Sequence, residues 1–178
     1  MGTQSEFLIG LVKSKGNVDF EEVYRTELPR VYNFFRYRVG DDQTAEDLTA
    51  ETFEKAWRHR KRYRDDLASF STWLFTIARR VATDHFRKRR PTVPLDEADH
   101  LSDPQTLEET AQERTDFARL SVLLARLAER ERELVALKYG AGLTNRAIAP
   151  ISGLSESNVS TILSRVTHQL RAQLENEP

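Results

Sequence analysis

Residues 144–171 read TNRAIAPISGLSESNVSTILSRVTHQLR and carry the strongest structural signal in the chain. Thr144 is a good N-cap for a short helix, Gly153 suits a tight turn, and Ser155 caps a long final helix. The apolar residues of that last helix recur at three- and four-residue steps and form one stripe: Val159, Ile162, Leu163, Val166 and Leu170. The pattern predicts a helix-turn-helix, although any small bundle with a short turn can resemble one. Two more helices are predicted before it, at 117–127 and 129–139.

Helical periodicity also runs through the first half. Apolar residues recur at helical steps from Phe20 to Phe35, with Pro29 either a kink or the start of a second helix. Gly40 ends this unit, and Thr44 precedes the next helix, at about 45–63. A third helix is expected at 71–90, after a loop at 64–69. The fold class is therefore all-α.

Positive charge is concentrated in one part of this first half. Residues 55–90 hold twelve Lys or Arg against three acids, whereas the whole chain has a formal charge of −1. Such clustering favours phosphate binding, although a charge run is often only a solvated face. Nearby aromatic residues could hold single-stranded bases by stacking. Trp73 fits the core equally well, so Tyr63 is the better stacking candidate.

An acidic stretch separates the two halves. Residues 91–114 contain seven acids and one Arg, and three prolines interrupt them. Such a segment cannot bury a core and is predicted to be a flexible linker. We therefore expect two small helical domains, 1–90 and 116–178, joined by an acidic linker at 91–115.

Several functional classes find no support. The chain has no cysteine, which excludes disulfides and thiolate ligands. The four histidines form no metal-binding pair, no phosphate-cradling glycine loop is present, and adjacent acids such as Asp41 and Asp42 are typical helix caps. We expect no enzyme activity, no metal and no cofactor. No apolar run could span a bilayer or serve as a secretory signal, which favours a cytoplasmic protein.

Four segments together resemble the extracytoplasmic-function (ECF) sigma factors of bacterial RNA polymerase. They are 19–24 (DFEEVY), 45–57 (AEDLTAETFEKAW), 70–80 (FSTWLFTIARR) and 143–172, in order and at the usual spacing. The resemblance implies an initiation factor that binds core RNA polymerase, recognises the minus-10 and minus-35 promoter elements and melts the former. Its first domain would be sigma region 2, and its helix-turn-helix domain region 4.

The resemblance also implies a set of site residues. Docking on the polymerase clamp helices would involve Asp47, Leu48, Glu51 and Phe53. The minus-10 surface would comprise Tyr63, Arg64, Ser69, Arg79, Arg80, Thr83, Asp84, Arg87 and Lys88. The minus-35 surface would comprise Thr144, Ser155, Ser157, Asn158, Ser160, Thr161, Ser164 and Arg165. This last set is poor in cations, which predicts weak DNA binding by the second domain alone.

Expected partners are core polymerase, through its clamp helices and flap, and promoter DNA. Family habit suggests an anti-sigma factor that clamps both domains, but no residue identifies one. A stand-alone helix-turn-helix repressor or activator is the alternative. Such a protein would dimerise and bind duplex DNA unaided, because two DNA half-sites a helical turn apart need one recognition helix each. A helical interaction protein would leave the basic surface unexplained.

Overall fold

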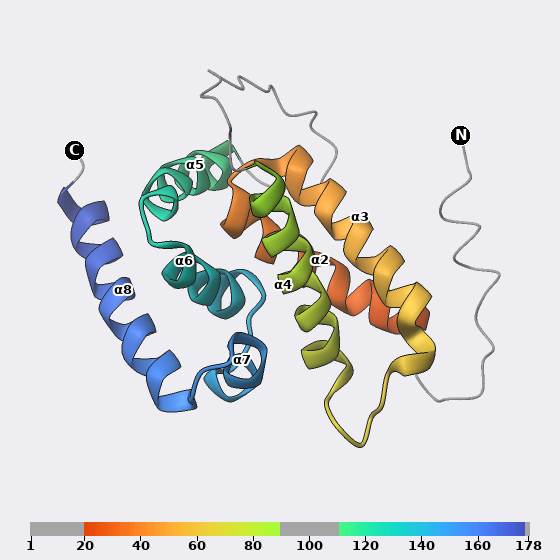
Figure 1. Ribbon diagram of the computed structural model, residues 1–178. Coiled ribbons are helices and arrows are strands. Elements are labelled where there is room, and N and C mark those ends of the chain that lie inside the picture. Colours follow the sequence, from red (N-terminus) through yellow and green to blue (C-terminus); the bar gives the residue numbers. More distant parts are fainter. Residues whose placement is uncertain (1–19, 90–110, 177–178) are drawn as a thin grey trace.

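The computed structural model describes residues 20–89 and 111–176. All regular structure in these two ranges is helical (Figure 1). The first unit holds α2 (Phe20–Val39), α3 (Asp42–His59), the short η1 (Arg60–Arg62) and α4 (Phe70–Arg89). The second holds α5 (Ala111–Ala125), α6 (Glu129–Val135), η2 (Ala136–Gly140), α7 (Asn145–Ser152) and α8 (Glu156–Asn176). The expected all-α class is confirmed.

The first unit is held together by aromatic and aliphatic side chains from all three long helices. Phe34 of α2 is fully buried and meets Phe75 of α4 edge to face, with ring centroids 6.0 Å apart. Pro29 does not divide α2, because packing of both flanking turns outweighs the one backbone hydrogen bond that proline cannot make. Gly40, at φ 73°, ends α2 in the left-handed region. The side chain of Asp41 then caps α3, three residues earlier than the sequence suggested.

The second unit follows the helix-turn-helix prediction closely. Thr144 accepts a hydrogen bond from the Ala147 amide and begins α7, and Gly153 ends it at φ 72°. Ser155 accepts from the Asn158 amide and begins α8. Pro150 lies in the last turn of α7, where it removes one intrahelical hydrogen bond, and the helix ends two residues later at Ser152. The predicted helix at 129–139 is two segments, since residues 136–140 adopt the wider π-helical geometry.

One boundary was placed wrongly. The second unit was expected to begin at residue 116, but α5 is already helical at Ala111. Residues 111–115 therefore belong to this helix and not to the linker, because their side chains are compatible with helix despite their polarity. The rest of the expected acidic linker, 91–110, lies outside the described residues.

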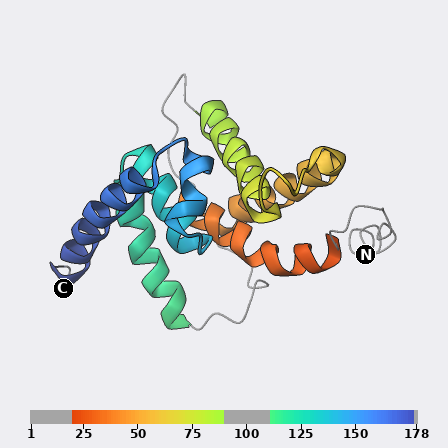
Figure 2. The same ribbon diagram turned by 90° about the horizontal axis from the view of Figure 1, so that it is seen from below.

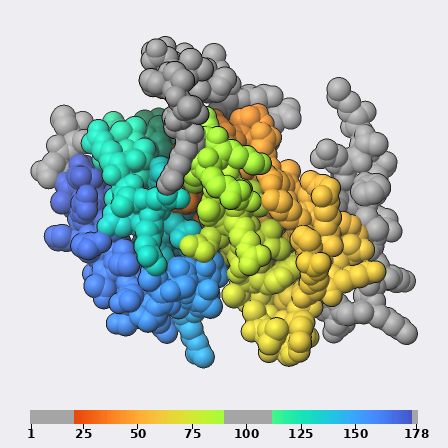
Figure 3. All heavy atoms as spheres, in the orientation of Figure 1, coloured from red at the N-terminus to blue at the C-terminus, as the bar shows by residue number. Residues whose placement is uncertain are grey.

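The two units pack directly against each other, which the sequence did not indicate. Helix α2 lies against α6 and η2, and α4 lies against α7. Seen from below, the second unit lies along one side of α2 and α4 (Figure 2). On the face shown in Figure 3, α4 is central, with α3 on one side and the second unit on the other. The buried residues of both units consequently form one continuous core.

Candidate nucleic-acid interface

Helix α4 has two chemically different faces. Leu74, Ala78 and Val81 are buried and fix the rotation of the helix about its axis. Arg80 and Lys88 are exposed on the other side, together with Thr83. Because helical residues three or four apart share a face, these side chains make a polar, cationic surface along α4.

Two residues at the end of α4 are already paired. Arg87 lies 3.0 Å from the carboxylate of Asp84, with side-chain exposures of 74% and 42%. A pair this exposed is weak, so the Arg87 guanidinium is free to exchange its partner for a phosphate. Asp84 therefore neutralises part of the surface on which it was expected to contact DNA.

The loop between η1 and α4 is well held by its own contacts. The Tyr63 hydroxyl donates to the Ala68 carbonyl oxygen over 3.2 Å, and the Tyr63 ring lies 5.4 Å from the ring of Trp73. Arg64 pairs with Asp66 at 2.6 Å. Ser69 caps α4 by accepting from the Thr72 amide. This geometry gives the loop a defined shape next to the basic face.

The stacking candidate was misjudged in this loop. Tyr63 was the preferred stacking candidate, which requires an exposed ring, but its ring is half-buried against Phe70 and Trp73, because all three aromatic rings cover the end of the core together. Leu67 was not singled out from the sequence, yet its side chain is 72% exposed at this loop. An apolar residue among charged loop residues was the signal that could have found it.

Arg79 does not join the basic face. Its Nε donates to Oε1 of Glu133, in α6 of the second unit, over 2.8 Å. The side chain of Glu133 is only 8% exposed, whereas that of Arg79 is 39% exposed, so the carboxylate is buried and the guanidinium is partly open to water. Arg79 was expected to contact DNA; in this structure it turns instead toward the second unit, because a buried carboxylate there needs a cation.

Helix α3 divides its four expected docking residues into two groups. Asp47 is exposed, and Glu51 is half-buried and pairs with Lys55 at 2.7 Å. Leu48 and Phe53 are only 5% and 6% exposed. Their side chains were expected at a docking surface, but they fill the core, because they lie on the side of α3 that faces α2 and α4. Leu48 and Phe53 therefore position α3, and their side chains are not available to a docking partner.

The exposed surface of α8 is polar. Ser157, Asn158, Ser160, Thr161 and Ser164 are all exposed along this helix. Thr144 and Ser155 were also expected to contact DNA. Their hydroxyls instead cap helices, because each accepts a hydrogen bond from a backbone amide. Arg165 pairs with Glu131 of α6 at 2.6 Å, and its side chain is 67% exposed.

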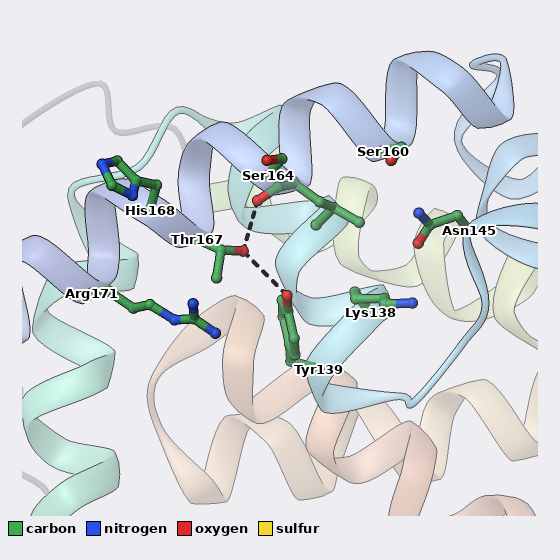
Figure 4. Close-up of a pocket in the computed structure, with 9 residues that line it drawn as sticks. Lys138, Tyr139, Asn145, Ser160, Ser164, Thr167, His168 and Arg171 are labelled. Carbon is green, nitrogen blue, oxygen red and sulfur yellow. Dashed lines mark hydrogen bonds between the residues drawn. The ribbon is translucent and has the colours of Figure 1, made fainter.

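A shallow groove of about 370 Å³ lies between η2 and α8 (Figure 4). Tyr139 crosses it, with its hydroxyl 3.2 Å from Oγ1 of Thr167. The groove also contains two cations outside the expected minus-35 set, Lys138 and Arg171. Its lining comprises Lys138, Tyr139, Asn145, Ser160, Leu163, Ser164, Thr167, His168 and Arg171. Lys138 was missed because it precedes the helix-turn-helix in sequence, although folding places it beside α8.

The described residues show neither a metal site nor a membrane-spanning helix. Within 20–89 and 111–176 there is no cluster of three or more His, Asp or Glu that could hold a metal ion. Among the helices described, none is long and apolar enough to cross a membrane.

Both halves of the chain match known protein families. Residues 23–92 match Sigma-70 region 2, and residues 123–172 match Sigma-70, region 4. The ECF RNA polymerase sigma factor RpoE of Cereibacter sphaeroides is 31% identical over 150 residues, which cover 83% of this chain and 80% of the relative. The ECF sigma factor BldN of Streptomyces coelicolor is 30% identical; the match covers 89% of this chain but 61% of BldN. SigM of Bacillus subtilis is 28% identical, with coverages of 85% and 93%.

Solved structures share the fold. The sigma factor RpoE from Bartonella quintana, solved with the anti-sigma factor NepR, has a TM-score of 0.70 and 24% identity, over 90% of this chain and 99% of that one. CnrH, solved with the cytosolic domain of CnrY, has a TM-score of 0.66 and 21% identity, with 97% of each chain covered.

Proposed function

Because this chain belongs to the ECF RNA polymerase sigma factors, we propose that it directs core polymerase to promoters through three surfaces of its own. The minus-10 element binds the exposed face of α4, which carries Arg80, Thr83, Arg87 and Lys88. The minus-35 element binds α8. The exposed side of α3 docks on the polymerase. As a sigma factor it would act in the cytoplasm and catalyse no reaction itself.

The division of α4 into two faces is the observation that carries this proposal. Its buried side is fixed by the core, so the cations on the other side of the helix face solvent. The loop at 63–69 stands at the start of the same helix and holds its shape through the Tyr63 and Arg64 contacts. A preorganised cationic face beside a shaped loop suits capture of a melted strand, because little order must be imposed on the protein when DNA binds.

The minus-35 assignment combines specificity from α8 with charge from the groove. Ser157, Asn158 and Ser160 can donate to and accept from base edges, but they neutralise no phosphate. Lys138 and Arg171 stand on either side of the groove next to α8 and supply that missing charge (Figure 4). We assign them to the DNA backbone.

Asp47 and Glu51 remain the two docking candidates on α3. They are one helical turn apart and lie on the side that the core leaves open. Their negative charge suits a basic partner surface. An anti-sigma factor is a further expected partner. The related RpoE was solved in complex with the anti-sigma factor NepR, and CnrH was solved in complex with the cytosolic domain of CnrY.

Reconstitution with core polymerase tests the proposed function. We expect the chain to co-purify with core enzyme at one copy per polymerase and to support run-off transcription from a promoter that core enzyme alone does not use. A stand-alone repressor would instead dimerise and bind duplex DNA without polymerase. Dimeric, sequence-specific binding by the free chain, with no transcription in the presence of core, would reject the sigma-factor function.

A further inference from the structure

The groove between η2 and α8 is lined by hydrogen-bond donors and cations. All of its lining residues belong to the described part of the chain, and none of them is acidic. The donors are Lys138 and Arg171, the hydroxyls of Tyr139 and Thr167, and the ring N–H of His168. Such a lining favours an anion, because no carboxylate in it opposes a negative charge.

Two features of this groove are not explained by a DNA backbone. Tyr139 is 50% exposed although it is a large aromatic residue, and Oδ1 of Asn145 is buried without a hydrogen-bond partner. In a duplex the base faces are covered by stacking, so a backbone that lies along α8 presents phosphates but no free base. An exposed aromatic ring suits stacking with an unpaired base, and an acceptor without a partner suits an N–H of that base.

These features follow one another along the groove in an order that matches a single nucleotide. Asn145 lies at one end, His168 and Arg171 lie at the other, and Tyr139 lies between them (Figure 4). A phosphate at Arg171 thus places a base beside the ring of Tyr139 and the polar edge of that base toward Asn145. Rotation about one side-chain bond turns Oδ1 of Asn145 to the ligand, and this oxygen loses no hydrogen bond by turning. The groove volume of about 370 Å³ is within the range of small-molecule sites, about 300–1,000 Å³.

We propose that the groove binds a free nucleoside monophosphate, and that the bound nucleotide excludes the minus-35 backbone from Lys138 and Arg171. Phosphate is common to a free nucleotide, to inorganic phosphate and to DNA, but only the free nucleotide also uses Tyr139 and Asn145. The exclusion rests on the proposed function, because it requires that the groove contact the minus-35 element. The nucleotide site itself rests on the groove alone.

Calorimetric titration of the full-length free chain tests the nucleotide site. The three probes are guanosine 5′-monophosphate (GMP), guanosine and inorganic phosphate. GMP should bind about tenfold or more tightly than either fragment, because only GMP engages the cationic end and the aromatic ring in one complex. Equal affinity for GMP and inorganic phosphate would overturn the nucleotide site and leave only a general attraction of anions.

Two variants locate the two ends of the bound nucleotide. Arg171→Ala should weaken GMP binding by at least fivefold and leave guanosine binding unchanged, because it removes only the phosphate contact. Tyr139→Leu keeps an apolar side chain but removes the ring, so it should weaken both GMP and guanosine. Arg126→Ala is the matched control, because Arg126 is exposed but does not line the groove. A loss of GMP binding in Arg126→Ala equal to that in Arg171→Ala would overturn the assignment to this groove.

Competition on reconstituted holoenzyme tests the exclusion. Saturating GMP should lower the affinity of the wild-type holoenzyme for a minus-35 duplex by at least threefold, as measured by fluorescence anisotropy of the labelled duplex. Holoenzyme with Tyr139→Leu is the control, because it keeps Lys138, Arg171 and the nucleotide sites of the polymerase, and its duplex binding should not respond to GMP. No loss in wild type, or an equal loss in the control, would overturn the exclusion. Failure of wild-type holoenzyme to bind the duplex without GMP would instead reject the proposed function, and calorimetry of the free chain would still decide the nucleotide site.

Discussion

The main chain of Gly140 lies so close to Asn33 that a Cβ on residue 140 would stand 2.8 Å from the Asn33 carbonyl oxygen. Gly140→Ala should therefore push η2 away from α2 and lower the free energy of unfolding by about 1–3 kcal/mol, as overpacking usually does. Thermal unfolding measures the cost, and small-angle scattering measures the separation of the units.

Gly142→Ala is the matched control for this variant. A Cβ there meets nothing within 4 Å, so its cost comes only from φ 65°. It should lower stability without changing the separation of the units. An unchanged radius of gyration in Gly140→Ala would show that the close approach does not set the spacing.

The polymerase contact is tested by Asp47→Lys with Glu51→Lys. Both positions are on the open side of α3, so the fold should survive while core polymerase is no longer retained in a pull-down. Glu54→Lys is the control, since the Glu54 side chain is exposed and pairs with Arg58. Circular dichroism confirms folding. Undiminished retention of core enzyme by the double variant would rule out this docking surface.

Promoter opening is tested by Arg80→Ala with Arg87→Ala. If the α4 face captures melted DNA, the double variant should form fewer open complexes on duplex promoter. It should lose less on a template already mismatched across the minus-10 element, because pre-melting removes part of the energetic demand. Permanganate footprinting on both templates measures the difference. Equal losses would mean that these arginines supply only general attraction.

The groove predicts how the second unit depends on salt. If Lys138 and Arg171 each neutralise one phosphate, replacing both with Ala should reduce the salt slope of minus-35 binding by about two. A salt titration of holoenzyme on a minus-35 duplex measures the slope. Arg126→Ala is the control, because Arg126 is exposed but does not line the groove. A slope that stays the same in the double variant would remove both residues from the interface.

Acid should weaken the first unit through His85. Burial lowers the pKa of this imidazole below its usual 6.5, and the nearby cations Arg89 and Lys88 add to the effect, while Glu51 opposes it. The unfolded chain then binds a proton more readily than the folded one, so stability should fall as pH drops below about 6.5. A histidine NMR titration measures the midpoint directly. A midpoint at or above 6.5 would contradict the environment described for His85.

Local sequence determined the helices and their ends. Thr144, Gly153 and Ser155 specify the helix-turn-helix because capping and left-handed turns depend on a few neighbouring residues. Periodicity likewise separated the buried side of α4 from its basic side. These features need no knowledge of distant parts of the chain, and the family resemblance rested on them.

Tertiary structure alone decided which of those side chains are available. Leu48 and Phe53 proved to be core residues, and Arg79 proved to be held by Glu133, 54 positions away in the chain. Lys138 joined α8 in one groove for the same reason. The sequence could not indicate these outcomes, because burial and ion pairing depend on which helices meet. That in turn was decided by the packing of α2 and α4 against the second unit, which no local pattern encodes.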